Sequence, residues 1–228
     1  MAKQSWISLD KVILIIGLII YGTGFSLLYI IFAPLSRSIG LSTNQFGILI
    51  AISNVALVFS SYFWGKKSQS MGRKPVFIIG LFSYAIAYAL FAFGIQIGLW
   101  GLLASWQLFS LLFIIRLLYG SLIGGIQPAA TAYISDTTDE TTRIKGMALI
   151  GMASGIGTII GPIVGGGLAF IHPIFPLYFG AGIAVLGGIL SMKFLIEPKQ
   201  QTPVSKTGNL KFYDKRIMPY LIGWGLVF

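Results

Sequence analysis

The sequence contains no cysteine and a single histidine, His172, among its 228 residues. The absence of cysteine excludes disulfides and thiolate metal sites, and one histidine is too few for a histidine metal cluster. Acidic residues are also scarce, with 6 Asp and Glu against 16 Lys and Arg, and only 10% of the chain is charged. Because a soluble domain averages about 25% charged residues, this composition excludes an ordinary soluble globule. A content of 14% aromatic residues excludes a disordered chain.

Long apolar runs take the place of the missing charges. Asp, Glu, Lys and Arg are absent from residues 12–36, 38–65, 75–115, 117–135 and 146–192. About 20 helical residues cross the apolar core of a bilayer, so the first two runs hold one helix each. The third and fourth runs, which only Arg116 separates, hold two helices together, and the last run holds two. The sequence therefore predicts an all-α membrane protein with six transmembrane helices, near residues 12–34, 43–65, 75–96, 105–134, 142–170 and 175–196.

The rest of the chain predicts a short linker and an incomplete helix. Residues 197–216 are polar and rich in lysine, and the apolar run that follows, 217–228, is too short to cross a membrane. We therefore divide the chain into a six-helix bundle at 1–196, a linker at 197–216 and the start of a seventh transmembrane helix at 217–228. The first apolar run is longer than the apolar region of a signal peptide, so we expect it to remain as the first helix.

Helix-end signals agree with these spans. The pairs Ser42/Gln45 and Thr137/Glu140 have the spacing of capping boxes, before the second and fifth helices respectively. Pro75 and Pro176 stand where the third and sixth helices begin, and a missing N–H costs nothing at that position.

Lysine and arginine predict the orientation. With six spans, 14 of the 16 Lys and Arg residues fall in segments 1–11, 66–74, 135–145 and 193–216, while Arg37 lies on the opposite side. Because Lys and Arg accumulate in cytoplasmic loops, the first side is predicted to be cytoplasmic. We expect a multi-pass protein of the cell (inner or plasma) membrane with a cytoplasmic N-terminus, in contact with the lipid bilayer and not with nucleic acid.

The segment between the second and third spans is predicted to be a tight basic loop. Gly65 and Gly72 allow a turn with positive φ, and Arg73 and Lys74 can bond helix ends or carboxylates. A basic loop that only sets the topology is the alternative interpretation.

The fifth span has glycine at every fourth position. Gly157, Gly161 and Gly165 form a smooth stripe that another helix can approach closely, and Pro162 permits a bend. We expect this stripe to receive a partner bundle, with ordinary packing of small residues as the alternative.

These segments resemble motifs of the major facilitator superfamily, in its twelve-helix branch of tetracycline and multidrug exporters, the drug:proton antiporters. Residues 65–74 are similar to its motif A, G-x-L-A-D-R-x-G-R-K, with Gln69 in place of Asp. The fifth span is similar to the antiporter motif, G-x-x-x-G-P-x-x-G-G, matched by Gly157, Gly161, Pro162, Gly165 and Gly166. Arg116 and Gly120 match motif B, R-x-x-Q-G, with Tyr119 in place of Gln, and residues 133–143 are similar to the loop that follows.

The resemblance implies a fold of two six-helix bundles that work by alternating access, each built as a 3+3 inverted repeat. The chain corresponds to the N-terminal bundle, so the C-terminal six-helix half is missing from it. Residues 20–23, Ile-Tyr-Gly-Thr, and 118–121, Leu-Tyr-Gly-Ser, occupy equivalent places in the repeat, either as counterparts or by chance.

The function that the resemblance implies is export of small amphipathic molecules in exchange for protons. A metabolite or siderophore exporter of the same fold and a truncated, non-transporting half-transporter remain alternatives. The sequence has no nucleophile–base set, no metal cluster and no phosphate loop beside a strand, so we expect neither an enzyme nor a cofactor.

Charged residues at two places are expected to have roles. A charge near mid-span costs roughly 2.5–3.5 kcal/mol, so Arg116 should face the bundle interior or a wet cavity, where the resemblance places proton coupling or substrate. Its distance of about 16 Å from the span end makes snorkelling difficult. The resemblance also implies a charge relay in which Arg73 pairs with Asp136. All six acidic residues lie outside the mid-membrane region, so a proton carrier would lie in the missing half, or coupling differs.

A substrate cavity is predicted from helix faces. Aromatic residues of the first span recur on one face, and two amides lie within the second and fourth spans. Aromatic rings with a few amides suit a large apolar or amphipathic substrate, whereas lipid-facing or core positions are the alternative. The candidate cavity residues are Tyr21, Phe25, Tyr29, Asn54, Tyr119 and Gln127, with Leu28 and Phe32 on the same face of the first span.

Overall fold

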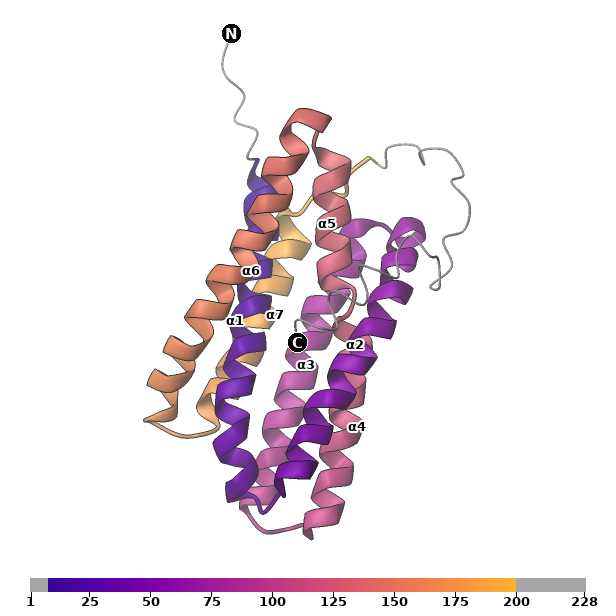
Figure 1. The fold of residues 1–228 in the computed structure, drawn as a ribbon. Coiled ribbons are helices and arrows are strands. Elements are labelled where there is room, and N and C mark those ends of the chain that lie inside the picture. The colour runs from indigo at the N-terminus through magenta and orange to yellow at the C-terminus, as the bar shows by residue number, and fades with distance from the viewer. Residues whose placement is uncertain (1–7, 200–228) are drawn as a thin grey trace. The chain divides into compact units, whose positions relative to one another are not determined.

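The computed structural model describes residues 8–199, which form a bundle of seven helices and no strand, with α5 continuing α4 end to end (Figure 1). Six spans are long and apolar enough to cross a membrane when α4 and α5 are counted together, which confirms the predicted number. The predicted seventh helix and most of the predicted linker fall outside the described residues. The helices are α1 (Leu9–Ser38), α2 (Thr43–Met71), α3 (Arg73–Leu99), α4 (Ser105–Ile123), α5 (Ile126–Thr137), α6 (Glu140–Ala169) and α7 (Phe175–Phe194).

One of the two predicted capping boxes is present. The Gln45 N–H donates to Ser42 Oγ over 3.2 Å, and the Ser42 N–H donates to Gln45 Oε1 over 2.9 Å. The prediction for Thr137 was wrong, because its hydroxyl donates to a carbonyl of its own helix and the residue ends α5. The N-cap of α6 is Asp139, whose carboxylate accepts from the Thr142 N–H over 3.1 Å.

The turn between α2 and α3 is shorter than the sequence predicted. Helix α2 continues through Met71 and α3 begins at Arg73, so Gly72 alone separates the two helices. Gly72 has φ of 101°, which L residues with a side chain rarely adopt, whereas Gly65 is helical. The predicted loop was wrong in extent because Lys, Gln and Met at 66–71 are good helix formers.

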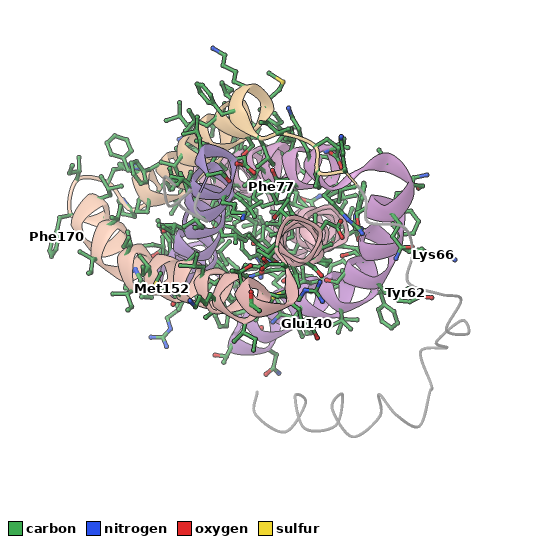
Figure 2. All side chains as sticks on the ribbon, turned by 90° about the horizontal axis from the view of Figure 1, so that it is seen from above. Tyr62, Lys66, Phe77, Glu140, Met152 and Phe170 are labelled. Carbon is green, nitrogen blue, oxygen red and sulfur yellow. The ribbon has the colours of Figure 1, made fainter. Side chains whose placement is uncertain are left out.

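Helix pairing follows the predicted 3+3 repeat. The first span, α1, packs mainly on α6 and α7, and the fourth span packs through α4 on α2 and α3. The first span thus contacts the fifth and sixth spans, and the fourth span contacts the second and third, as a repeat that relates spans one to three to spans four to six requires. The third and sixth spans, α3 and α7, pack on each other. Side chains from these helices fill the interior of the bundle, as the view along it shows (Figure 2).

The short repeated string marks equivalent contacts in the two halves of this repeat. A Cβ on Gly22 of α1 would lie 2.7 Å from the Ser154 carbonyl oxygen of α6. A Cβ on Gly120 of α4 would collide with the Ser53 carbonyl oxygen of α2 and would lie 2.8 Å from the Ala56 Cβ. In each case the glycine lets a helix approach a serine carbonyl of its partner, which supports the counterpart interpretation.

The glycine stripe of α6 is occupied within the bundle. Gly157, Gly161 and Gly165 are buried against α1, and a Cβ on Gly157 would lie 2.5 Å from the Ile19 carbonyl oxygen. The expectation that these three glycines receive a partner bundle was therefore wrong, because α1 already fills the groove that they make. Gly166, the last glycine of the antiporter-like segment, has open space at its Cβ position.

Two spans carry the open faces of the bundle. Only 22% of the most apolar stretch of α2, and likewise of α6, is buried, against 44–56% in the other four spans. Large apolar side chains stand exposed on both helices, for example Phe59 on α2 and Ile163 on α6. These two helices are therefore the least covered of the six spans within residues 8–199.

Candidate functional site

An aromatic ladder runs along α1, as the sequence predicted. The ring centroids of Tyr21 and Phe25 lie 6.2 Å apart, and those of Phe25 and Tyr29 lie 5.1 Å apart. Phe25 and Tyr29 are half-buried, whereas Leu28 and Phe32 are fully buried in the core. The half-buried end of the ladder therefore lies at Phe25 and Tyr29, and the other two side chains serve packing.

Two hydrogen-bonded pairs extend this half-buried surface. Asn54 Nδ2 of α2 donates to Tyr29 Oη over 3.2 Å, which joins α2 to α1. Gln127 Nε2 of α5 donates to Ser154 Oγ of α6 over 2.9 Å. All four side chains are half-buried. Amides that are partly exposed within membrane-length helices are costly against acyl chains, so this surface is suited to a wet cavity or another polypeptide.

Arg116 of α4 lies in the bundle interior, one of the two surroundings predicted for it. Its side chain is 2% exposed, and its Nε donates to the Leu49 carbonyl oxygen of α2 over 3.1 Å. The guanidinium carbon lies 5.5 Å from the centroid of the Phe91 ring and 5.2 Å from that of Tyr119. No carboxylate of the described residues lies within ion-pair distance. Among residues 8–199, cation–π contacts and one carbonyl thus hold this positive charge.

A tyrosine cluster borders Arg116. The Tyr84 and Tyr88 rings stack at 4.6 Å, and the Tyr119 ring lies 5.9 and 6.0 Å from them. The Tyr88 hydroxyl donates to the Gly24 carbonyl oxygen, and the buried Tyr84 hydroxyl has no hydrogen-bond partner among residues 8–199. The predicted cavity residues Tyr21 and Tyr119 belong to this buried cluster, in the interior of the bundle.

Sequence reasoning missed Tyr84 and Tyr88. Both lie on α3 with four-residue spacing, which puts them on one face of that helix. The four-residue spacing that identified the aromatic ladder on α1 also applies to α3, so a search for tyrosines on one face of each span would have found Tyr84 and Tyr88.

The predicted pair of Arg73 and Asp136 forms an ion pair. Arg73 Nε lies 2.9 Å from Asp136 Oδ2, and Arg73 Nη1 donates to Ser68 Oγ over 2.7 Å. The pair joins the first residue of α3 to the last turn of α5 and is mostly buried. A partly desolvated, charge-assisted hydrogen bond of this kind is stronger than an exposed surface pair, and the bond to Ser68 orients the guanidinium.

Glu197 is a second acidic residue at this place that the sequence analysis did not single out. Its carboxylate accepts from the Arg73 N–H over 2.6 Å and from the Lys74 N–H over 2.9 Å. The chain holds 123 residues between Arg73 and Glu197, so no local pattern could have indicated the contact.

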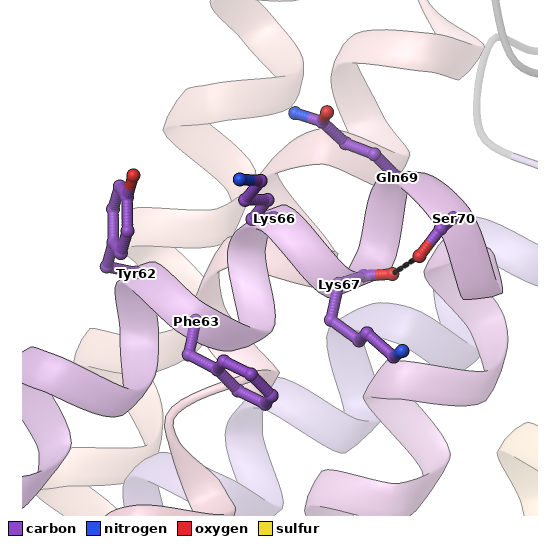
Figure 3. A pocket seen from close by; sticks show the side chains of 6 residues that line it. All are labelled: Tyr62, Phe63, Lys66, Lys67, Gln69 and Ser70. Carbon is purple, nitrogen blue, oxygen red and sulfur yellow. Dashed lines mark hydrogen bonds between the residues drawn. The ribbon is translucent and has the colours of Figure 1, made fainter. Parts of the chain in front are cut away.

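An open groove of about 630 Å³ lies along the last turns of α2 (Figure 3). Gln69, which the motif comparison singled out, is exposed and lines it together with two aromatic and two lysine side chains. Lys67 contributes its carbonyl oxygen to a hydrogen bond from Ser70 Oγ, 3.0 Å long. Gln69 contributes no charge to this groove, whose ionic groups are Lys66 and Lys67.

Comparison with known proteins places this arrangement among transporters. The family described as Major Facilitator Superfamily matches residues 14–228. Multidrug resistance protein 1 of Bacillus subtilis (strain 168) is 31% identical over 205 residues, which are 90% of this chain and 50% of that protein. Quinolone resistance protein NorA of Staphylococcus aureus (strain MRSA252) is 26% identical over 73% of this chain and 40% of its own length.

A solved structure shares the fold. The crystal structure of the human organic anion transporter MFSD10 (TETRAN) aligns with a TM-score of 0.62 at 22% identity, over 84% of this chain and 49% of that one. At this level of identity the likeness concerns the fold alone. The chain spans about half the length of the curated relatives that it matches.

Proposed function

Because the chain belongs to the Major Facilitator Superfamily, we propose that it is the N-terminal half of a proton-coupled exporter of small amphipathic molecules. The exporter would work by alternating access, with a second six-helix half packed on the open faces of α2 and α6. The proposed orientation puts the N-terminus in the cytoplasm, because 14 of the 16 Lys and Arg residues then lie on that side.

The observation that carries the proposal is the set of half-buried side chains Phe25, Tyr29 and Asn54, together with the hydrogen-bonded pair of Gln127 on α5 and Ser154 on α6. Aromatic rings offer contact area to an apolar or planar substrate, and the amides supply a small number of hydrogen bonds. The resistance proteins of the comparison support substrates of this class. A metabolite with many hydroxyl or charged groups would need more polar partners than this surface offers.

Dye transport in cells that express the whole exporter, with this chain as its N-terminal half, tests the proposal. We expect energised cells to extrude ethidium, and we expect collapse of the proton gradient by an ionophore to stop extrusion. Asn54→Ala should reduce extrusion, because it removes the amide from the proposed cavity. Ile86→Ala is the matched control, since Ile86 is an exposed apolar residue on α3. Extrusion that is unaffected by the ionophore would refute proton coupling, and equal effects of the two variants would refute the cavity.

The proposed charge relay is tested separately. The ion pair of Arg73 and Asp136 supports a relay at the end of the bundle where α1 begins.

We further propose that Arg116 contributes its positive charge to the coupling of protons or substrate. It is a buried residue that contacts α2 through the Leu49 carbonyl and α3 through the Phe91 ring.

A further inference from the structure

Glu197 closes a ring of contacts around Arg73. Arg73 uses its side chain to bind Asp136 and its backbone N–H to bind Glu197. Asp136 lies one turn after Tyr133 on α5, and the Tyr133 hydroxyl lies 2.7 Å from the Ile196 carbonyl oxygen. Ile196 is bonded covalently to Glu197, which completes the circuit. We call these five residues the Arg73 ring.

The segment that carries Glu197 is fixed at several points. Leu195 and Pro198 are buried, which holds the chain after α7 against the bundle. The Tyr133 hydroxyl also lies 2.8 Å from Asp10 Oδ2 and can donate its single proton to either acceptor, so α1 is attached to the same point. The Glu197 carboxylate is therefore presented to α3 by a segment with a defined path.

Gly72, which precedes α3, leaves space for the Glu197 carboxylate at the start of that helix. As the N-cap of α3 it has no side chain that could accept the free N–H groups of the first turn, and Glu197 supplies the missing acceptor. A Cβ on Gly72 would lie 2.8 Å from a Glu197 carboxylate oxygen, and the backbone φ of 101° disfavours any side chain. The missing Cβ of Gly72 thus leaves room for the Glu197 carboxylate, and the positive φ favours glycine at the same position.

We propose that Glu197 is a positioning residue for the Arg73–Asp136 ion pair. By binding two N–H groups at the start of α3, the carboxylate fixes the backbone from which the Arg73 side chain reaches Asp136. It also places a negative charge beside the turn, where Gln69 offers none. Since Glu197 begins the predicted linker, the contact ties the first residue of that linker to the ion pair.

Hydrogen exchange of the purified protein tests the contact without any transport assay. In Glu197→Ala the amides of Arg73 and Lys74 lose a charge-assisted acceptor, so their exchange should accelerate about tenfold or more. Glu140→Gln is the control, because it removes the charge of an exposed acidic residue in the first turn of α6. Unchanged exchange at 73 and 74 in Glu197→Ala would overturn the proposal.

Glycine substitutions give a second, matched comparison. Gly72→Ala should accelerate the same two amides, because the new Cβ displaces the Glu197 carboxylate. Gly40→Ala introduces a side chain at a positive φ of 73° but has nothing within 4 Å of the new Cβ, so it controls for backbone strain alone. Equal exchange at residues 73 and 74 in the two variants would contradict the role assigned to Glu197.

The positioning role itself rests on the proposed transport function and is tested by a double-mutant comparison. Arg73→Ala keeps the backbone N–H that binds Glu197, so it removes only the side-chain half of the ring. If Glu197 acts through the ion pair, Glu197→Ala should lower ethidium extrusion in the wild-type background and have no further effect in Arg73→Ala. Glu197→Gln, which keeps one acceptor oxygen, should retain intermediate extrusion. If the losses of extrusion in Glu197→Ala and Arg73→Ala are additive, the positioning role is overturned, even where accelerated exchange confirms the contact. If the wild-type protein extrudes no dye, only the proposed transport function is refuted.

Discussion

The contact between α1 and α6 gives the sharpest test of the packing, through the substitution Gly157→Ala. The new Cβ would lie 2.5 Å from the Ile19 carbonyl oxygen and 2.7 Å from the Thr23 nitrogen. Carbon and oxygen atoms in proteins approach to about 3.3–3.6 Å, so α6 must move away from α1 by about 1 Å. Both obstacles are backbone atoms, which a side-chain rotation cannot remove.

The expected cost follows from two opposing effects. Overpacking of this kind destabilises by about 1–3 kcal/mol, partly because a gap of about 1 Å forfeits dispersion contacts along the interface. Alanine favours the helix over glycine by about 1 kcal/mol. Gly155→Ala separates the two effects, since Gly155 lies on the same helix with nothing within 4 Å of its Cβ position. We expect Gly157→Ala to be less stable than Gly155→Ala by about 1–3 kcal/mol.

Unfolding of the purified protein in mixed micelles, followed by circular dichroism, measures this difference. Gly155→Ala should equal or exceed the wild-type free energy of unfolding, and Gly157→Ala should fall below it. Gly22→Ala approaches the same interface from α1, with a Cβ 2.7 Å from the Ser154 carbonyl oxygen, and should also destabilise. Equal stabilities of Gly155→Ala and Gly157→Ala would refute the interpretation of the stripe as a site of close helix approach.

Three further predictions concern the charged residues. Arg73→Ala or Asp136→Ala should lower ethidium extrusion and leave the amount of protein in the membrane unchanged on immunoblots; normal extrusion by both variants would count against the relay. Arg116→Met should abolish extrusion without lowering the free energy of unfolding, because an apolar side chain replaces a buried charge that has no counter-ion among the described residues; a variant that is unstable but fully active would contradict this. Hydrogen bonds from the Thr142 N–H and hydroxyl lower the pKa of Asp139 below its ordinary value of 3.8. The stabilisation it gives to the start of α6 is therefore present above that value and lost as the pH falls through the lowered pKa, and Asp139→Asn should abolish this acid dependence in hydrogen exchange of residues 140–143.

Local patterns predicted the number of spans and several contacts correctly. Apolar runs of this length are satisfied in a bilayer as helices, because every backbone polar group then bonds within its own segment. The aromatic ladder on α1 follows from helical spacing alone, and so does the Ser42/Gln45 capping box. The pairing of Arg73 with Asp136 came from the family resemblance, and the structure brings these two side chains together.

Predictions that depended on competition between neighbouring groups were wrong. Thr137 has the spacing of an N-cap, yet its hydroxyl bonds the preceding helix and Asp139 takes the cap. Residues 66–71 look like a basic loop, but they extend α2 because only Gly72 needs a non-helical backbone. Polarity alone does not separate an exposed helical turn from a loop.

The sequence by itself determined that residues 8–199 hold six spans of membrane length, that the chain belongs with the major facilitators and that it carries glycines where helices can approach. Only the tertiary structure decided what those helices meet: α1 fills the glycine stripe of α6, tyrosines of α3 stack near Arg116, and Glu197, distant along the chain, caps α3. The reason is physical, since hydropathy and helical spacing act within one segment of about 20 residues. Helix partners and caps between distant segments depend on side-chain shape and hydrogen-bond geometry, which no single segment contains.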